Sequence, residues 1–266
     1  MHLKDKVIVI TGASAGIGAA LALALARRGA RLMLAARDGS KLEQVAGACR
    51  KLGARALASV SDVARPADCQ ALIERTLREF GGIDVLVNNA GITMWSRFDA
   101  LSDLSIFEQL MKINYLGAVY VTKHALPALK ASRGLIVAVA SVAGFTGVPE
   151  RTGYTASKHA MVGFFESLRI ELEGTGVDVS IVAPDFVVSE VHKRAIGPDG
   201  KPLGVSPMQT ARIMTAEDCA ARIVSAIEQR KRLVIMSLRG RLGRWAKLLA
   251  PKLIDRVAAN AIRRRH

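Results

Sequence analysis

The stretch KVIVITGASAGIG, residues 6–18, decides the fold that we expect for this chain. Its first five residues are mostly β-branched and apolar, which is typical of a short strand buried on both faces. The glycine-rich part that follows opens an apolar stretch, which predicts a helix ending at Gly29. In this setting Gly12 would permit a tight turn, Gly16 would let a pyrophosphate approach the helix N-terminus, and Gly18 would let the helix pack closely on the strand. A purely structural glycine turn is the alternative.

Outward from this stretch, predicted strands alternate with predicted helices over most of the chain. We expect strands at 31–36, 54–60, 83–91, 134–141, 177–184 and 232–236, and helices at 39–53, 67–82, 103–130, 152–173 and 216–229. This alternation predicts an α/β fold, a doubly wound parallel β-sheet of the Rossmann type with helices on both faces. Ligands of such sheets bind at the carboxyl ends of the strands, so we expect the functional residues there.

Length and composition suit one domain with a sizeable core, because the chain has 266 residues and half of them are apolar. We assign residues 1–238 to this domain and residues 239–266 to a basic C-terminal helical tail. Three scattered cysteines, Cys49, Cys69 and Cys219, have neither disulfide nor metal spacing. They indicate small buried side chains, no metal site and a reducing compartment, and together with the lack of a signal-peptide pattern they predict a cytoplasmic protein.

Polar residues follow two of the predicted strands. VNNAG, residues 87–91, ends the fourth strand, where Asn88 and Asn89 offer side-chain amides and Gly91 leaves room for a ligand. The asparagines could instead cap the strand end. Asp62, after the third strand, could accept a hydrogen bond from an adenine amino group or cap the next helix.

SVAGFTGVPERTGYTASKHA, residues 141–160, combines a hydroxyl, a phenol and an ammonium. Tyr154 and Lys158 are four residues apart, so a helix places both on one face. Ser141 lies thirteen residues before Tyr154, beyond the reach of local helix geometry. A free Tyr has a pKa of about 10, and a neighbouring ammonium lowers it toward the range of a useful acid–base catalyst. A Tyr and a Lys at this spacing can also be plain surface neighbours.

Taken together, TGASAGIG, NNAG, Asn114 in KINYLG, Ser141 and YTASK resemble a classical short-chain dehydrogenase/reductase over residues 5–236. The resemblance implies an enzyme that interconverts a ketone or aldehyde and an alcohol by hydride transfer. Tyr154 would be its acid–base group, Lys158 would support the Tyr, and Ser141 would orient the substrate oxygen. Asn114 would anchor a water in a proton relay.

The resemblance also implies a nicotinamide dinucleotide as cofactor. We expect the following residues to contact this cofactor: Gly12, Ser14, Ile17, Gly18, Arg37, Asp62, Val63, Asn88, Ala90, Gly91, Tyr154, Lys158, Pro184, Val187 and Ser189. Gly18 and Arg37 are included because of their own chemistry, and the others because of the resemblance. One departure from the family is Asp185, which follows Pro184 where Gly is usual. It bears on the local turn and on the pocket near the nicotinamide, but not on cofactor binding itself.

The end of the second predicted strand selects between the two nicotinamide cofactors. Members that prefer NAD usually have an acid there to hold the ribose. This strand ends at Ala36 and is followed by Arg37, whose planar guanidinium suits a 2′-phosphate. Asp38 lies one residue after the position of that acid, and the resemblance implies that its side chain points away from the ribose. We therefore expect NADP(H), with a solvated Arg37 as the alternative.

Residues 186–212, which are rich in Pro and Gly, correspond to the mobile substrate lid of the family. Four apolar residues are candidate pocket walls and favour an apolar or lipid-like substrate, with ordinary core packing as the alternative: Met94, Trp95, Phe145 and Met208. A different class of function is also open, that of a non-catalytic, dinucleotide-binding regulatory or membrane-associated protein. The set of Asn114, Ser141, Tyr154 and Lys158 argues against it.

Two surfaces are expected to meet partners. By resemblance, the helices at 103–130 and 152–173 pair subunits into a homodimer or homotetramer. The tail carries nine Lys or Arg and one Asp, in a chain of formal net charge +15, and its Leu, Trp and Ile residues recur at helical spacing. That pattern is typical of a helix at an anionic membrane surface. We nevertheless favour packing of this helix on the protein itself or on a dimer partner over membrane contact, and nucleic-acid binding is the least favoured.

Overall fold

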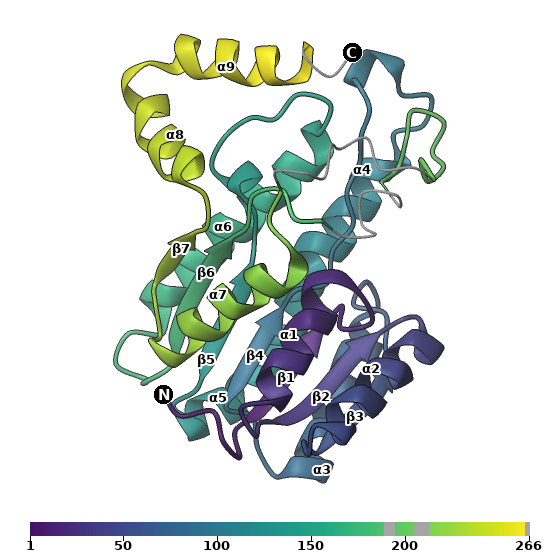
Figure 1. Ribbon diagram of the computed structural model, residues 1–266, viewed down its shortest axis with the longest axis vertical. Coiled ribbons are helices and arrows are strands. Elements are labelled where there is room, and N and C mark those ends of the chain that lie inside the picture. The colour runs from purple at the N-terminus through teal and green to yellow at the C-terminus, as the bar shows by residue number, and fades with distance from the viewer. Residues whose placement is uncertain (189–194, 205–212, 264–266) are drawn as a thin grey trace.

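The structure, a computed structural model, describes residues 1–188, 195–204 and 213–263. Within them, parallel strands form one seven-stranded sheet with the order β3-β2-β1-β4-β5-β6-β7 (Figure 1). The chain starts in the middle of the sheet, runs to the edge at β3 and then crosses back to build the other half. The strands are β1 (Val7–Thr11), β2 (Arg31–Ala36), β3 (Ala56–Val60), β4 (Val85–Asn88), β5 (Leu135–Val139), β6 (Asp178–Ala183) and β7 (Leu233–Ile235).

Helices cover both faces of the sheet (Figure 1). One layer consists of α1 (Gly16–Ala26), α2 (Gly39–Lys51) and α7 (Ala216–Glu228), and the other of α3 (Pro66–Phe80), α5 (Gly117–Ser132) and α6 (Thr152–Glu171). Each layer encloses its own apolar core, because successive side chains of a strand point to opposite faces. Ile8 and Ile10 of β1 thus enter one core, and Val7 and Val9 enter the other. The predicted doubly wound fold is confirmed.

The helix expected over 103–130 is not continuous. A π-helical segment, Met111–Leu116, separates α4 (Ser105–Leu110) from α5. Its wider turn accommodates Asn114, which is fully buried. Such segments often occur at functional sites, and they shift the helical register too little for apolar periodicity to detect them.

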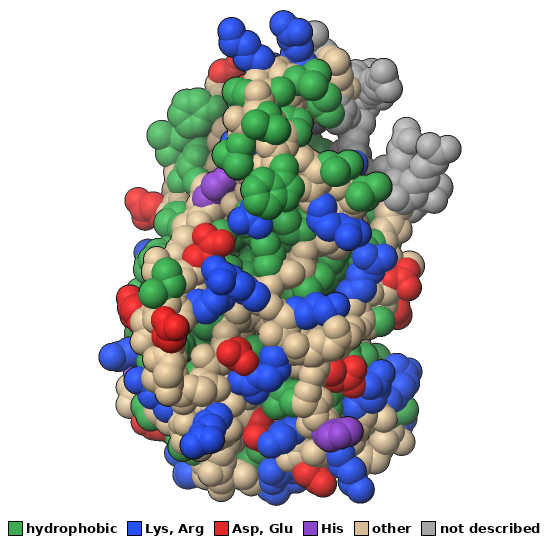
Figure 2. Space-filling view, turned by 90° about the vertical axis from the view of Figure 1, so that its left-hand side faces the viewer, with side chains coloured by type: hydrophobic (Ala, Val, Ile, Leu, Met, Phe, Trp, Pro, Cys, Tyr) green, Lys and Arg blue, Asp and Glu red, His purple; other side chains and the backbone are tan. Residues whose placement is uncertain are grey.

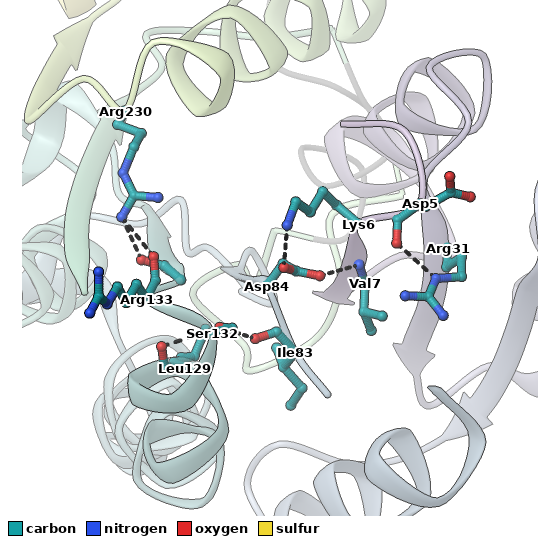
Figure 3. Close-up of polar contacts among 11 residues, drawn as sticks. Asp5, Lys6, Val7, Arg31, Ile83, Asp84, Leu129, Ser132, Arg133 and Arg230 are labelled. Atoms are coloured by element: carbon teal, nitrogen blue, oxygen red, sulfur yellow. Dashed lines mark hydrogen bonds and ion pairs between the residues drawn. The ribbon is translucent and has the colours of Figure 1, made fainter. Parts of the chain in front are cut away.

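Polar contacts tie together the amino ends of the strands (Figure 3). Asp84 accepts hydrogen bonds from Lys6 Nζ and from the backbone N–H of Val7, both at 2.8 Å. Arg230 Nη2 donates to the carbonyls of Arg133 at 3.1 Å and Gly134 at 2.8 Å. This end of the sheet is therefore closed by structural contacts, and the opposite end carries the loops that can hold a ligand.

The three cysteines are free and buried, as predicted. Burial raises the pKa of Cys49 to about 11 and the pKa values of Cys69 and Cys219 to about 12. All three are therefore protonated at neutral pH and act as small core side chains.

The segment between β6 and α7, in which we expect the lid, is described only in part. Its residue Ile196 forms isolated bridges with Met94 and Pro202, so the segment contacts the chain that follows β4. Residues 189–194 and 205–212 of this region lie outside the described residues.

The tail forms two helices, α8 (Leu238–Leu249) and α9 (Pro251–Arg263), which rise beyond the carboxyl end of the sheet (Figure 1). The break falls at Pro251, which cannot continue a preceding helix. Among the described residues, no helix is both long and apolar enough to cross a membrane.

Candidate active site

A cavity of about 800 Å³ lies over the carboxyl ends of the strands. It extends from the glycine loop after β1, past the ends of β2 and β4, to the segments that follow β5 and β6, and α8 and α9 contribute to its wall. Its position is the one at which parallel sheets bind ligands, and its size is that of cofactor and substrate pockets.

The glycine loop is fitted closely to the chain that follows β4. Gly12 has a φ of +65°, and a Cβ there would lie 2.8 Å from Ala90 Cα, so a larger residue does not fit. A Cβ at Gly18 would lie 2.3 Å from the Gly12 carbonyl oxygen, in line with its expected packing role, and Gly18 itself does not line the cavity. The N-cap of α1 is Ala15, which offers no capping side chain. The first N–H groups of α1 therefore remain available to an anion.

The two asparagines after β4 occupy different positions. Asn88 is buried, and its Nδ2 donates to Thr122 Oγ1 at 2.9 Å. Asn89 lines the cavity, and its Nδ2 donates to the carbonyls of Thr11 at 2.9 Å and Gly12 at 3.1 Å. Asn88, expected at the cofactor, thus lies outside the cavity wall, whereas Asn89, absent from the expected contact set, braces the glycine loop. The alternation of side chains along a strand separates the two.

Most residues expected to contact a dinucleotide line this cavity: Gly12, Ser14, Ile17, Arg37, Asp62, Val63, Ala90, Gly91, Tyr154, Lys158, Pro184 and Val187. Ser189 lies outside the described residues. Asp62 Oδ1 also accepts from the backbone N–H of Ala64 at 3.0 Å. Arg37 is exposed beyond the end of β2, and the neighbouring Asp38 caps α2 by accepting from the N–H of Lys41 at 3.1 Å.

Tyr154, in the first turn of α6, forms a side-chain hydrogen bond with Ser141, which follows β5. Ser141 Oγ also accepts from the N–H of Ala143 at 3.2 Å, which helps to orient the hydroxyl. Desolvation raises the pKa of Tyr154, and the hydrogen bond with Ser141 and the charge of Arg151 oppose this only in part. The sequence predicted a lowered pKa from the neighbouring ammonium. In the protein alone the direction is upward, because desolvation outweighs the charges.

Lys158 lies one turn further along α6, on the same face as Tyr154. It is buried, its Nζ donates to the Val139 carbonyl at 2.9 Å, and Nζ lies 5.9 Å from the centroid of the Tyr154 ring. Burial lowers the pKa of Lys158 to about 8, so the side chain is mostly charged at pH 7. The helical spacing of Tyr154 and Lys158 thus places both side chains at the same cavity.

Asn114 supports this region from behind the cavity wall. Its Oδ1 accepts from the N–H of Ile92 at 2.8 Å, and its Nδ2 donates to the Ile92 carbonyl at 3.0 Å and to Ser157 Oγ at 2.9 Å. The side chain therefore connects the chain after β4 to α6. It does not line the cavity, and its role in a proton relay stays a prediction.

Arg151 is a cavity residue that the sequence did not single out. It is buried, and its guanidinium carbon lies 4.1 Å from the Trp95 ring centroid, 5.1 Å from that of Phe186 and 5.9 Å from that of Tyr154. These distances allow cation–π contacts with all three rings. A lone Arg before a helix carries no local pattern, so only the fold reveals its surroundings.

The four apolar residues expected at the substrate pocket differ in position. Trp95 and Phe145 line the cavity, whereas Met94 is fully buried and does not. Met208 lies outside the described residues. The tail adds a further apolar part of the wall, made of Ile254, Val257 and Ala258 in α9.

Asp185 links the end of β6 to the tail. Its Oδ1 accepts from the N–H of Phe186 at 3.0 Å, and its Oδ2 accepts from Ser237 Oγ at 2.6 Å. Arg239 donates to both carboxylate oxygens, from Nε at 2.6 Å and from Nη2 at 2.7 Å. Burial by itself would raise the pKa of Asp185, but the hydrogen bonds from Arg239 and Ser237 and the charge of Arg239 hold this pKa below its usual value. The usual glycine of the family could form none of these contacts.

Comparison with known proteins agrees with this geometry. The family model described as "short chain dehydrogenase" matches residues 6–197. A similar relative, "11-beta-hydroxysteroid dehydrogenase 1A" of Arabidopsis thaliana, is 38% identical over 264 residues, which cover 96% of this chain and 74% of the relative.

Two solved structures are also similar. A short chain dehydrogenase/reductase from Burkholderia phymatum in complex with NAD is 27% identical, with a TM-score of 0.81 and coverage of 94% of this chain and 96% of that one. An alcohol dehydrogenase from Thermococcus sibiricus complexed with 5-hydroxy-NADP is 27% identical, with a TM-score of 0.76 and coverage of 88% and 96%.

The Rossmann-type sheet with a cavity at its carboxyl ends and the matches to dehydrogenases together define an oxidoreductase. The chain belongs to the short-chain dehydrogenase family. The resemblance found in the sequence is therefore confirmed, and with it an oxidoreductase that acts on CH–OH groups.

Proposed function

We propose that the protein is an NADP(H)-dependent oxidoreductase that interconverts an apolar ketone or aldehyde and the corresponding alcohol, with Tyr154 as the acid–base group. One observation carries the proposal: Ser141, Tyr154 and Lys158 line the same cavity as the glycine loop. A dinucleotide that begins at that loop can therefore end beside a phenol that is able to exchange a proton with the substrate.

The cavity fits a dinucleotide. The uncapped N-terminus of α1 suits a pyrophosphate, and Pro184 and Val187 would lie at the nicotinamide end. Arg37 would hold the 2′-phosphate of NADP(H), because it is exposed at the cavity and no carboxylate of the described residues forms an ion pair with it. Ala36, at the end of β2, offers no acid to hold the ribose of NAD.

In the reduction, NADPH supplies the hydride. Tyr154 donates its proton to the carbonyl oxygen as negative charge develops there, and Ser141 donates a second hydrogen bond to the same oxygen. The raised pKa of Tyr154 keeps the phenol protonated at neutral pH, as this step requires. Lys158 and Arg151 stabilise the phenolate that remains, because both carry positive charge close to the ring. For the oxidation, the positive charges of Lys158, Arg151 and the oxidised nicotinamide would have to lower this pKa, and the resulting phenolate would accept the proton of the alcohol.

An apolar substrate is supported by the aromatic and aliphatic side chains of the wall, among them Trp95, Phe145 and Val257. The name of the Arabidopsis relative refers to a hydroxysteroid, which is a large and mainly apolar alcohol. The proposed function is tested by following NADPH oxidation against a panel of short-chain, long-chain and ring ketones. A protein that binds NADPH but reduces none of them would instead be the non-catalytic regulator that forms the alternative.

We further propose that α5 and α6 pair two subunits. Two apolar residues of the helices expected to pair subunits, Leu110 and Leu168, are buried within the monomer, but Ile170 on α6 is 70% exposed. The wild-type protein is expected to be a dimer or tetramer by light scattering at micromolar concentration, and Ile170→Glu should weaken this association, because a charge placed in an apolar contact is not compensated. Leu52→Glu, on an exposed residue at the end of α2, serves as the control. A monomeric wild type would contradict the proposal.

The tail is proposed to bind an anionic membrane surface. Leu242, Trp245 and Leu249 of α8 follow helical spacing and are 61%, 65% and 88% exposed. Figure 2 shows hydrophobic side chains gathered over the upper part of this side of the molecule, where the tail lies, with basic side chains around them. Each cation near an anionic surface contributes about 1 kcal/mol, and inserted apolar side chains add to this. The protein is therefore expected to co-sediment with anionic vesicles, and less so in high salt.

The control for membrane binding uses residues that do not line the main cavity. Leu242→Ser combined with Leu249→Ser should abolish co-sedimentation, whereas Leu104→Ser, on an equally exposed residue outside the tail, should not. Sedimentation that is independent of lipid charge would exclude the electrostatic part of the proposal. If the double variant loses its oligomeric state instead, the exposed face of α8 belongs to a subunit interface.

A further inference from the structure

We propose that Asp185, Ser237 and Arg239 form a latch that holds the tail over the cavity, so that α9 is the far wall of a subsite for a long apolar chain or a fused ring system of the substrate. The inference rests on the proposed function, because it assigns the position of that substrate. The inference goes beyond the proposed function by making the tail part of the active site. The tail would then have two faces, one toward the membrane and one toward the substrate.

The latch joins a mostly buried carboxylate to an arginine side chain that is 66% exposed. The Asp185 side chain is only 14% exposed, and it takes donors from three residues: Phe186, Ser237 and Arg239. Arg239 binds both carboxylate oxygens, the bidentate geometry that gives the strongest pairs. Its guanidinium carbon also lies 5.4 Å from the Phe186 ring centroid. Asp185 is adjacent to Pro184 in the cavity wall, so the latch connects the tail directly to the proposed nicotinamide end.

Three further contacts hold α8 on the segment that follows Ser141. Gly240 packs so closely that a Cβ there would lie 2.8 Å from Val142 Cγ2. One turn later, the Arg244 guanidinium carbon lies 5.2 Å from the Phe145 ring centroid, and Lys247 Nζ donates to the Phe145 carbonyl at 3.4 Å. The base of the tail is therefore held at two walls of the cavity, one after β5 and one after β6.

The second tail helix presents an apolar face to the cavity. Ile254, Val257 and Ala258 are spaced by three and one residues, which places them on one side of α9, and all three line the cavity. Leu253, by contrast, does not line it. Val257 and Leu253 are 58% and 56% exposed. They are therefore matched in exposure and share one helix, but only Val257 lines the cavity.

This arrangement predicts how the Michaelis constant depends on substrate length. The reacting carbonyl must lie at Tyr154, and only a substrate long enough to reach α9 can bury the apolar side chains there. Each methylene that becomes buried lowers the Michaelis constant about threefold to fourfold. In a series of methyl ketones from butanone to the long-chain undecyl methyl ketone, the Michaelis constant should therefore fall with length, and α9 should matter for the long members alone.

The experiment compares Val257→Ser and Leu253→Ser across this series with NADPH saturating. Val257→Ser should raise the Michaelis constant for undecyl methyl ketone about fivefold to tenfold. The Michaelis constant for butanone and the turnover numbers for both ketones should stay within about twofold. Leu253→Ser should change none of these values. Equal effects of the two variants, or an effect of Val257→Ser on butanone, would overturn the assignment of α9.

The latch itself is tested with Asp185→Asn and Arg239→Gln, with Arg241→Gln on the same helix as control. Each latch variant should raise the Michaelis constant for undecyl methyl ketone about tenfold more than the Michaelis constant for butanone. The double variant should be no worse than either single one, because both remove one interaction. Additive losses, or losses that are equal for short and long ketones, would contradict the latch.

A readout without catalysis separates the two proposals. Both latch variants should speed cleavage of the full-length protein by chymotrypsin after Trp245 about fivefold or more, since the tail then opens more often. Undecyl methyl ketone should slow that cleavage in the wild type but not in Val257→Ser. If no ketone is reduced, the proposed function fails, but the proteolysis still tests whether the latch holds the tail. Unchanged cleavage in both latch variants would overturn it.

Discussion

Replacing Tyr154 with Phe is expected to lower the turnover number for ketone reduction at least about 100-fold, the usual effect of removing an acid–base group. The substitution removes one oxygen and keeps the ring, so the contact with the Arg151 guanidinium should remain. The affinity for NADPH should stay within about twofold, because the loss concerns an interaction made in the transition state.

The size of this effect follows from the chemistry of the residues that remain. Ser141 carries the hydroxyl that is hydrogen-bonded to Tyr154. An aliphatic alcohol of this kind is a much weaker acid than a phenol. Lys158 directs its ammonium to the Val139 carbonyl, so it supports the phenol but does not replace it. Without the phenolic proton, the negative charge on the substrate oxygen would be left without a proton donor at a desolvated site.

The measurement is the initial rate of NADPH oxidation at saturating ketone, together with NADPH binding followed by its fluorescence. Tyr120→Phe is the control, because Tyr120 packs against the core formed with α5 and does not line the cavity. Wild-type turnover in Tyr154→Phe would refute Tyr154 as the acid–base group and leave the family membership untouched.

Replacing Arg37 with Ala is expected to weaken NADPH binding by about 1.5–3 kcal/mol, the contribution of a hydrogen bond to a charged group. At about 1.4 kcal/mol per factor of ten, this is a rise in the dissociation constant of roughly 10- to 150-fold. NADH lacks the 2′-phosphate, so its affinity should barely change. The preference for NADPH over NADH should therefore fall by the same factor.

Titration of both cofactors into wild type and Arg37→Ala measures this preference. Arg78→Ala is a suitable control, because Arg78 is exposed on α3 and does not line the cavity, so the variant makes the same change of charge elsewhere. Equal losses for NADPH and NADH in Arg37→Ala would mean that Arg37 acts through packing against the adenosine and not through the phosphate.

Local patterns in the sequence were sufficient for the fold class. The β-branched stretches are strands because each is short and bounded by turn residues, and the glycine loop joins β1 to α1 as its residues predicted. The helix expected over 103–130 is confirmed over most of its length, but it contains a π-helical segment, Met111–Leu116. Within this segment, Asn114 forms hydrogen bonds with Ile92 and Ser157, residues that are distant in sequence.

The sequence by itself also determined which residues meet at the carboxyl ends of the strands. Tyr154 and Lys158 share a face of α6 because four residues span one helical turn. Residues directly after parallel strands gather at one edge of the sheet, which is why Gly12, Asp62 and Val187 line one cavity.

Only the tertiary structure decided the contacts that join distant segments. It turned Asn89 and not Asn88 toward the glycine loop, and it surrounded Arg151 with aromatic rings. It also paired Asp185 with Arg239, 54 residues further along the chain. The physical reason is that helix and strand periods relate only neighbouring residues. Which carboxylate receives which guanidinium depends on how whole elements pack, and the tail became a wall of the cavity through that packing.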